Sequence, residues 1–311
     1  MIDVSCIIIN YNTSKFTINA VASIFNKNDD SISFEVIVVD NASRIEDFKS
    51  LKVGLAQLNQ SNLKLVRSKI NTGFGAGNMY GIQHATLCKY YAFINNDTLQ
   101  VSKNCLLSLK NFMDSNKDAA VCSPQMLDED KKFRVTIDHF SSLQREIFRR
   151  PILETLFPKT YLNRKKEFSK PTRVHYVQGS FMFTNADLFN AIGGFDTNLF
   201  LYYEESDISR RLLKEKSKFT YIVPNLKYIH YKNVSTTKNI AIKIEQKISL
   251  LYYIEKHYGW FHKKILNLYY VIRYFFTSII KPKYWKLFLI LMQGAPLYKS
   301  LKQKQLINEE Y

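Results

Sequence analysis

The fold of this chain is decided by the stretch Val4-Ser5-Cys6-Ile7-Ile8-Ile9-Asn10-Tyr11-Asn12. Its compact apolar run, rich in β-branched residues, predicts a strand buried on both faces, and the polar residues after it predict a loop. Similar strands are predicted over 35–39 and 63–67, with helices over 15–27 and roughly 45–58 between them. This alternation predicts an α/β protein with a doubly wound sheet.

Polar clusters follow three strands of the predicted sheet. A strand predicted over 91–94 runs directly into Asn95-Asn96-Asp97-Thr98, and similar clusters occupy 10–14 and 40–43. Ligands of open parallel sheets bind outside the carboxyl ends of the strands. We therefore expect the three clusters to converge on one crevice.

Two features near this crevice each have a functional and a structural interpretation. Asp40 can accept hydrogen bonds from a nucleobase or a ribose, or it can cap the next helix. The stretch Asn71-Thr72-Gly73-Phe74-Gly75-Ala76-Gly77-Asn78 precedes a helix predicted over 79–87. Its glycines suit a phosphate at a helix N-terminus or a tight turn, and their spacing excludes the G-x-G-x-x-G fingerprint of dinucleotide sites.

Candidate metal ligands and candidate bases lie further along the chain. Asp97 ends a strand, where one carboxylate and substrate phosphates can hold Mg²⁺ or Mn²⁺. His230 follows a strand predicted over 219–223, and such a histidine is either structural or a metal ligand. The cluster Glu204-Glu205-Ser206-Asp207 follows an aromatic run and begins a predicted helix. Its carboxylates can serve as helix caps, or they can raise one another's pKa as a general base requires.

Composition restricts the class of protein. The chain has 311 residues, 46% of them hydrophobic, so it can bury a large core, and its net charge of +17 indicates an anionic partner. The cysteines Cys6, Cys88, Cys105 and Cys122 have no metal-site spacing, and we expect them to be reduced and buried. Because Met1-Ile2-Asp3-Val4 does not resemble a signal peptide, we expect the catalytic part to face the cytoplasm.

Charge and periodicity divide the chain into an α/β half (1–130), a basic insertion (131–173), a second catalytic half (174–240) and a helical C-terminal region (241–311). The insertion has twelve Lys or Arg against four Asp or Glu, and we expect it to be partly helical and to border the acceptor side. Residues 256–304 contain ten Lys or Arg and no acid, interleaved with aromatic and aliphatic residues. This pattern predicts basic amphipathic helices that lie on an anionic membrane, or that pack on the catalytic domain or in a homodimer.

The order of these motifs resembles that of bacterial family 2 glycosyltransferases, including their rhamnosyltransferase-like branch, over roughly residues 3–235. The resemblance rests on the segments 4–12, 36–43, 71–77, 95–97, 179–182, 193–196 and 204–207. It implies a GT-A fold, with a mixed, mostly parallel sheet and helices on both faces. It also implies inversion at the anomeric carbon of the transferred sugar.

Carried over position by position, the resemblance implies a nucleotide-sugar donor site and a metal. Asp97 and His230 would ligate Mg²⁺ or Mn²⁺, and Glu205 would remove the acceptor proton, with Glu204 and Asp207 beside it. The donor site would be formed by Asn10, Asn12, Asp40, Asn41, Asn71, Gly73, Gly75, Gly77, Asn95, Asn96, Asp97, Gly179 and Ser180. Two positions depart from the family: Glu205 stands where Asp is usual, and Asn95 stands where many relatives begin Asp-x-Asp.

The expected reaction moves a sugar from dTDP-rhamnose or a UDP-hexose to a polyprenyl-diphosphate-linked glycan at the inner face of the plasma membrane, for O-antigen or capsule synthesis. One alternative is a sugar nucleotidylyltransferase, which would need a basic glycine-rich loop that residues 10–14 lack. The other is a non-catalytic basic protein that binds a membrane surface or nucleic acid and whose transferase site has decayed. Because the mixture of basic and aromatic residues lies in the helical tail rather than on a sheet, we expect no nucleic-acid partner.

Overall fold

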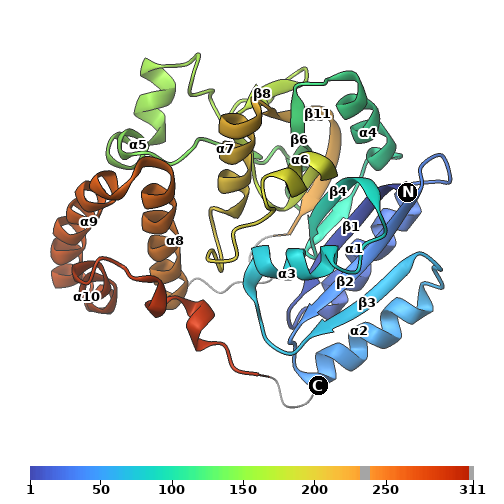
Figure 1. Ribbon diagram of the computed structural model, residues 1–311, viewed down its shortest axis with the longest axis horizontal. Coiled ribbons are helices and arrows are strands. Elements are labelled where there is room, and N and C mark those ends of the chain that lie inside the picture. Colours follow the sequence, from blue (N-terminus) through green and yellow to red (C-terminus); the bar gives the residue numbers. More distant parts are fainter. Residues whose placement is uncertain (232–238, 308–311) are drawn as a thin grey trace.

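The computed structural model describes residues 1–231 and 239–307, which are built around a mixed, mostly parallel β-sheet (Figure 1). Its strands are β1 Ile2–Asn10, β2 Phe34–Asn41, β3 Leu63–Ser68, β4 Cys88–Asn95, β5 Thr98–Gln100, β6 Ala119–Leu127, β8 Thr172–Val174, β10 Phe181–Asn185 and β11 Phe219–His230. They follow the order β3-β2-β1-β4-β10-β6-β11-β5, with β8 also paired to β11. The predicted α/β fold class is confirmed.

The parallel part of the sheet brings the polar clusters together. β3, β2, β1 and β4 are parallel neighbours, whereas β10 runs antiparallel between β4 and β6. β11 is parallel to β6 and antiparallel to β5 and β8. Asn10 pairs with Asp40, and Ile9 pairs with Asn95. The carboxyl ends of β1, β2 and β4 are therefore aligned, and the loops that follow them lie at the same edge.

Helices cover both faces of the sheet (Figure 1). One face packs against α1 (Ser14–Lys27), α2 (Ile45–Gln57) and α4 (Cys105–Ser115), and the other against α3 (Gly73–Ile82), α6 (Ala186–Ala191) and α7 (Glu204–Lys216). Cys6 and Ile8 enter the first core, and Ile7 enters the second. Because successive side chains of a strand point to opposite faces, burial on both faces explains why β1 is apolar throughout.

The C-terminal region has a third hydrophobic core of its own. It is formed by α8 (Ile240–Tyr258), α9 (Trp260–Ile280) and α10 (Trp285–Met292), with short turns η1 (Pro282–Tyr284), η2 (Leu297–Lys299) and η3 (Leu301–Lys304). The insertion contributes α5 (Leu143–Leu156), which contacts α9, and β7 (Ile137–Asp138), which pairs with β9 (Tyr176–Val177). The predicted C-terminal helices are confirmed. In the described ranges, no helix is both long and apolar enough to cross a membrane.

Two predicted element bounds are wrong. The helix expected over 79–87 is α3, which begins at Gly73 and so includes the glycines that we expected to precede it. The strand expected over 219–223 continues to His230, because an irregularity between Val223 and Lys227 lets β11 resume its pairing with β6. Residues 232–238, within the expected second catalytic half, lie outside the described residues.

Candidate active site

A cavity of about 520 Å³ lies at the carboxyl ends of β1, β2 and β4. Seven residues predicted from the sequence line it: Asn41, Asn71, Gly73, Asn95, Asn96, Asp97 and His230. Tyr11, Thr13 and Arg134 also line it, as do Leu301 and Gln305 from the end of the chain. We call this space the donor cavity. The expected convergence of the loops after these strands is thus present in the structure.

A second cavity of about 370 Å³ adjoins the first and contains the acid pair. Gly179, Ser180, Glu204 and Glu205 line it, so the first two lie here rather than in the donor cavity. We call this space the acceptor cavity. Both cavities are lined by Phe74, Asn95, Leu201 and His230. A group bound beside Asn95 and His230 is therefore accessible from both sides.

Asp97 and His230 meet at the donor cavity because of strand pairing. The register of β5 against β11 places His230 opposite Thr98, and the Tyr231 N–H donates to the Asp97 carbonyl at 2.9 Å. As a result, His230 Nε2 lies 3.1 Å from Asp97 Oδ1. Within the described ranges, His230 Nδ1 is buried without a hydrogen-bond partner.

The donor set at this point fits a divalent cation that also binds phosphate. A carboxylate and an imidazole are adjacent and line a cavity, and Mg²⁺ or Mn²⁺ commonly takes one or two protein ligands beside substrate phosphates. No group of three or more His, Cys, Asp or Glu side chains that could hold a metal occurs among the described residues. Asn96 donates its amide to Thr13 and Thr17, at 2.6 and 2.9 Å, which fixes the loop beside Asp97.

The acid pair begins α7 directly after a strained turn. Tyr202 and Tyr203 both have left-handed backbones, with φ of 74° and 75°, which is uncommon outside glycine. The turn is held from two sides: Ser249 Oγ of α8 donates to the Leu201 carbonyl at 2.8 Å, and the Phe74 N–H donates to the Phe200 carbonyl at 3.0 Å. Backbone strain that neighbouring elements maintain is typical of functional sites.

The carboxyls of this cluster differ in their pKa values. Burial raises the pKa of Glu205 to about 7, with a further contribution from the negative charge of Asp138, while a hydrogen bond from the Gly179 backbone opposes the shift. Glu204 is 2% exposed, and burial next to Glu205 raises its pKa well above the usual value. Glu204 therefore holds its proton more tightly than an ordinary glutamate, whereas Glu205 exchanges its proton near neutral pH.

Asp207, the third predicted catalytic acid, does not line either cavity. It is fully buried against α8, with Arg211, Lys256 and His257 within 2.7 to 2.8 Å of its carboxylate. Although burial opposes ionisation, these partners lower its pKa to about 2. Asp207 thus joins α7 to α8.

Several expected donor-site residues lie behind the cavity wall instead of lining it. Asn10 and Asp40 are fully buried, and Asn10 Nδ2 donates to Asp40 Oδ1 at 3.0 Å. Arg67 Nε lies 3.2 Å from the other Asp40 oxygen. Asn12 is exposed, and its side-chain oxygen accepts from the Arg44 N–H at 2.9 Å. These contacts hold the loops that carry Tyr11, Thr13 and Asn41 to the cavity.

Gly75 and Gly77 have a packing role inside α3. A Cβ at Gly77 would lie 2.9 Å from Ile9 Cδ1, and a Cβ at Gly75 would lie 3.2 Å from the Phe195 Cβ. Gly73 is different because its φ of +81° and the nearby Phe200 carbonyl exclude a side chain there. The glycines therefore let α3 lie close to β1 and to the turn before the acid pair.

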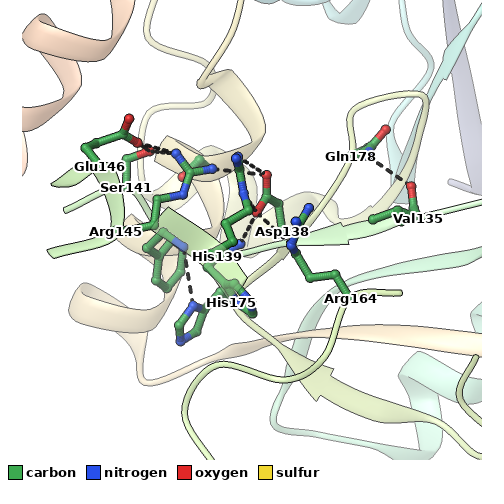
Figure 2. Close-up of polar contacts among 12 residues, drawn as sticks. Val135, Asp138, His139, Ser141, Arg145, Glu146, Arg164, His175 and Gln178 are labelled. Atoms are coloured by element: carbon green, nitrogen blue, oxygen red, sulfur yellow. Dashed lines mark hydrogen bonds and ion pairs between the residues drawn. The ribbon is translucent and has the colours of Figure 1, made fainter. Parts of the chain in front are cut away.

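The insertion contributes a charge network to the acceptor cavity (Figure 2). Asp138 accepts hydrogen bonds from Arg150 at 2.5 and 2.7 Å and from Arg145 at 3.1 Å, and Figure 2 shows Arg164 approaching the same carboxylate. Asp138, Arg145 and Arg150 all line the cavity that contains Glu205. Arg145 is 5% exposed, and within the described part of the chain its Nε has no partner.

Sequence reasoning missed Arg134 and the C-terminal residues of the donor cavity. Arg134 lies in the insertion, which we expected on the acceptor side, yet its guanidinium donates to the His230 carbonyl at 2.7 Å and lines the donor cavity. Its positive charge was visible in the sequence, but its position depends on the return of the chain after β6. Leu301 and Gln305 carry no motif.

Comparison with known proteins places this arrangement in a family. Residues 5–193 match the family model described as glycosyl transferase family 2. An N-acetylglucosaminyl-diphospho-decaprenol L-rhamnosyltransferase of Mycobacterium tuberculosis is 30% identical over 28% of this chain and 29% of its own length. A low-salt glycan biosynthesis hexosyltransferase, Agl10 of Haloferax volcanii, is 26% identical over 68% of this chain and 62% of its own length. The matches thus span less than two thirds of these relatives.

Two solved glycosyltransferase structures share the fold. GalNAc-T7, with UDP, GalNAc and Mn²⁺, matches 94% of this chain and 56% of its own, with a TM-score of 0.63 and 15% identity. The mannosyltransferase PcManGT from Pyrobaculum calidifontis, in complex with GDP-Man and Mn²⁺, matches 96% of this chain and 89% of its own, with a TM-score of 0.56 and 12% identity. The GT-A architecture expected from the motifs is confirmed. The strands and loops that form the donor cavity agree with the matching family model, and the chain therefore belongs to glycosyl transferase family 2.

Proposed function

We propose that this protein is an inverting glycosyltransferase that moves a sugar from a nucleotide-sugar donor to a glycan acceptor. The proposal rests on the contact between two cavities. One contains the Asp97–His230 pair and the other contains Glu205, and the two cavities meet at Asn95 and His230. A sugar held at this junction can have its diphosphate on one side and an acceptor hydroxyl on the other. Such a geometry suits a single in-line displacement, which inverts the anomeric carbon.

The donor cavity would hold the nucleoside diphosphate. A Mg²⁺ or Mn²⁺ ion held by Asp97 and His230 would neutralise charge on the leaving diphosphate, and the two structural neighbours contain Mn²⁺. Arg134 adds a positive charge to the same wall. Asn71 can bind the nucleoside directly. Asn41 is buried with its amide bound to Asn71, Thr72 and Gly73, so it positions its loop, as Asn10 and Asp40 do.

Glu205 would act as the general base. Its pKa of about 7 leaves a substantial fraction ionised at neutral pH and still gives a carboxylate basic enough to accept the proton of the acceptor hydroxyl. Glu204 lies beside it and lines the same cavity, and burial raises its pKa well above the usual value. The extra methylene of Glu205, relative to the Asp usual in the family, lets the carboxylate extend from the start of α7 to Gly179.

The acceptor cavity favours an acceptor that carries phosphate on a lipid. Arg145 and Arg150 line this cavity, and Arg145 has the unpartnered Nε described above. The same helix, α5, exposes the large apolar side chains Phe148, Ile152 and Leu156. Glu205 would thus contact the acceptor sugar, the arginines its diphosphate, and α5 its polyprenyl chain, as in the decaprenol-linked substrate for which the mycobacterial relative is named.

The outer face of α9 supports attachment to an anionic membrane. Its exposed apolar residues recur at helical spacing and lie opposite the buried face of the helix: Phe261, Ile265, Leu268, Ile272, Phe275, Phe276 and Ile279. Exposed basic residues accompany them on α9 itself (Lys264 and Arg273), in the turn after it (Lys281 and Lys283) and on α10 (Lys286). An amphipathic face of this composition suits the interface of a bilayer with anionic lipids. We place the enzyme at the inner face of the plasma membrane.

A transfer assay tests this function. Purified protein with Mn²⁺ is incubated with dTDP-rhamnose, UDP-hexoses and GDP-mannose, and with a synthetic sugar-diphosphate-polyprenol acceptor. We expect one donor to be used, and NMR of the product should give the inverted anomer. If the folded protein neither hydrolyses nor transfers any of these sugars, and binds no nucleoside diphosphate, a non-catalytic binding protein replaces our proposal. Formation of a nucleotide sugar and pyrophosphate from a nucleoside triphosphate and a sugar 1-phosphate would instead indicate a nucleotidylyltransferase.

The acceptor arginines can be tested separately. Arg150→Gln should raise KM for the diphosphate-linked acceptor about tenfold and change KM little for the same sugar without phosphate. Arg149, the adjacent arginine, is exposed and does not line the cavity, so Arg149→Gln is the matched control. Equal effects of Arg150→Gln on both acceptors would refute a phosphate subsite here.

A further inference from the structure

The chain after α10 returns to the catalytic half. In Figure 1 it leaves α10, passes below α8 and runs toward the α/β half of the chain. The segment 297–307, which we call the return segment, is anchored at two points. Ser300 Oγ and the Leu301 N–H donate to Glu245 of α8, at 2.8 and 2.7 Å, and Lys302 Nζ donates to the Thr197 carbonyl at 2.6 Å.

The return segment forms part of the wall of the donor cavity. Leu301 and Gln305 both line the space that also contains Asn71, Asp97 and His230. Gln305 donates its side-chain amide N–H to the Leu301 backbone carbonyl at 2.9 Å, which holds the Gln305 side chain against the return segment. The side chains between them, Gln303 and Lys304, are exposed and line no part of this cavity.

One face of α8 connects this wall to the catalytic turn. Ile242 lines the donor cavity, Glu245 binds the return segment, and Ser249 holds the Leu201 carbonyl before the acid pair. These residues are three and four positions apart, so they lie on the same side of the helix. Glu245 is 1% exposed and thus fixed by its packing.

We propose that the return segment is a donor-binding element, in which Leu301 and Gln305 contact the nucleotide part of the donor and Glu245 is the positioning residue. The inference rests on the proposed function for the nature of the ligand. The amide of Gln305 can donate to a phosphate or ribose oxygen or accept from a ribose hydroxyl, and Leu301 offers an apolar surface. The C-terminal region then contributes to donor recognition as well as to any membrane contact.

A matched pair of glutamines tests the proposal. Gln305→Glu places a negative charge on the wall of the donor cavity, where it would repel a diphosphate, and Gln303→Glu adds the same charge two residues away in solvent. We expect the dissociation constants of UDP and dTDP with Mn²⁺, measured by calorimetry, to rise about tenfold in Gln305→Glu. Gln303→Glu should leave them within about twofold of those of the unaltered protein.

Glu245→Gln provides the second measurement. It weakens the anchor of Ser300 and Leu301, so the donor KM should rise about three- to tenfold while the acceptor KM stays unchanged. If Glu245 had a purely structural role, the substitution would lower kcat or the melting temperature without raising the donor KM selectively. Equal binding of UDP and dTDP by the unaltered protein and by Gln305→Glu would overturn the inference. If the unaltered protein itself binds neither nucleotide, the proposed function fails instead.

Discussion

The Nε2 atom of His230 lies 3.1 Å from Oδ1 of Asp97, although the two residues belong to different halves of the catalytic region. Antiparallel pairing of β5 with β11 produces this contact, and the hydrogen bond from Tyr231 to the Asp97 carbonyl fixes it. Because both side chains also line the donor cavity, the pair is well placed to hold a cation against a diphosphate.

The first prediction follows from this pair. Asp97→Asn should reduce Mn²⁺-dependent binding of UDP or dTDP by about tenfold or more, because a neutral amide is a much weaker ligand than a carboxylate. His230→Ala should weaken it less. Calorimetry with and without EDTA measures the effect. Asp130→Asn, a change of an exposed carboxylate outside both cavities, is the control. Full transfer activity in excess EDTA would contradict a role for the metal.

The second prediction concerns the acid pair. Glu205→Gln should lower kcat by about 10² to 10⁴ with donor binding nearly unchanged, because the base is lost while the size is kept. Glu204 is buried and its pKa is raised well above the usual value, which makes it less available as a base, so Glu204→Gln should have a smaller effect. Single-turnover transfer and thermal unfolding of both variants separate chemistry from folding. A severe loss in Glu204→Gln with a mild one in Glu205→Gln would reverse the assignment.

The third prediction is a pH dependence. The base acts when ionised, so kcat/KM should rise with pH through the Glu205 pKa of about 7. Asp138→Asn removes a negative charge that raises this pKa, and it leaves Arg145 and Arg150 less neutralised beside the cavity. Both changes favour the ionised form of Glu205, so the rise of kcat/KM with pH should shift to lower pH. A rise that stays in place or moves to higher pH would contradict Glu205 as the titrating group.

The fourth prediction concerns the outer face of α9. Charge reversal of Lys264, Arg273 and Lys286 to Glu should abolish flotation with phosphatidylglycerol vesicles at low salt, since each basic residue near an anionic leaflet contributes about 1 kcal/mol. Lys49 and Lys52, exposed on α2, provide the control pair for the same change. Point changes are preferable to truncation because the C-terminal helices share one core. If the unaltered protein stays off the vesicles and is dimeric, this face is a subunit interface.

Local sequence determined the framework. Apolar runs with β-branched residues have few ways to bury both faces other than a parallel sheet covered by helices, so β1, β2 and their neighbours were predictable. Since parallel strands place their carboxyl ends at one edge, the position of Asn95 and Asp97 at the crevice also followed. The order of the family's motifs also indicated Glu205 and His230 as site residues. The structure places His230 where the two cavities meet and Glu205 in the wall of the acceptor cavity.

Only the tertiary structure decided which polar residues reach the cavities. Asp40 lies at the end of its strand as expected, but its carboxylate is bound by Asn10 and Arg67 and does not line the donor cavity. Both partners come from other strands. Asp207 sits next to the acid pair in sequence, yet helical geometry turns it toward α8. Arg134 reaches the donor cavity because the chain turns back on β6, and Gln305 reaches it through the chain after α10. Sequence periodicity specifies which face of an element is buried, whereas contacts between distant segments depend on how all the elements pack together.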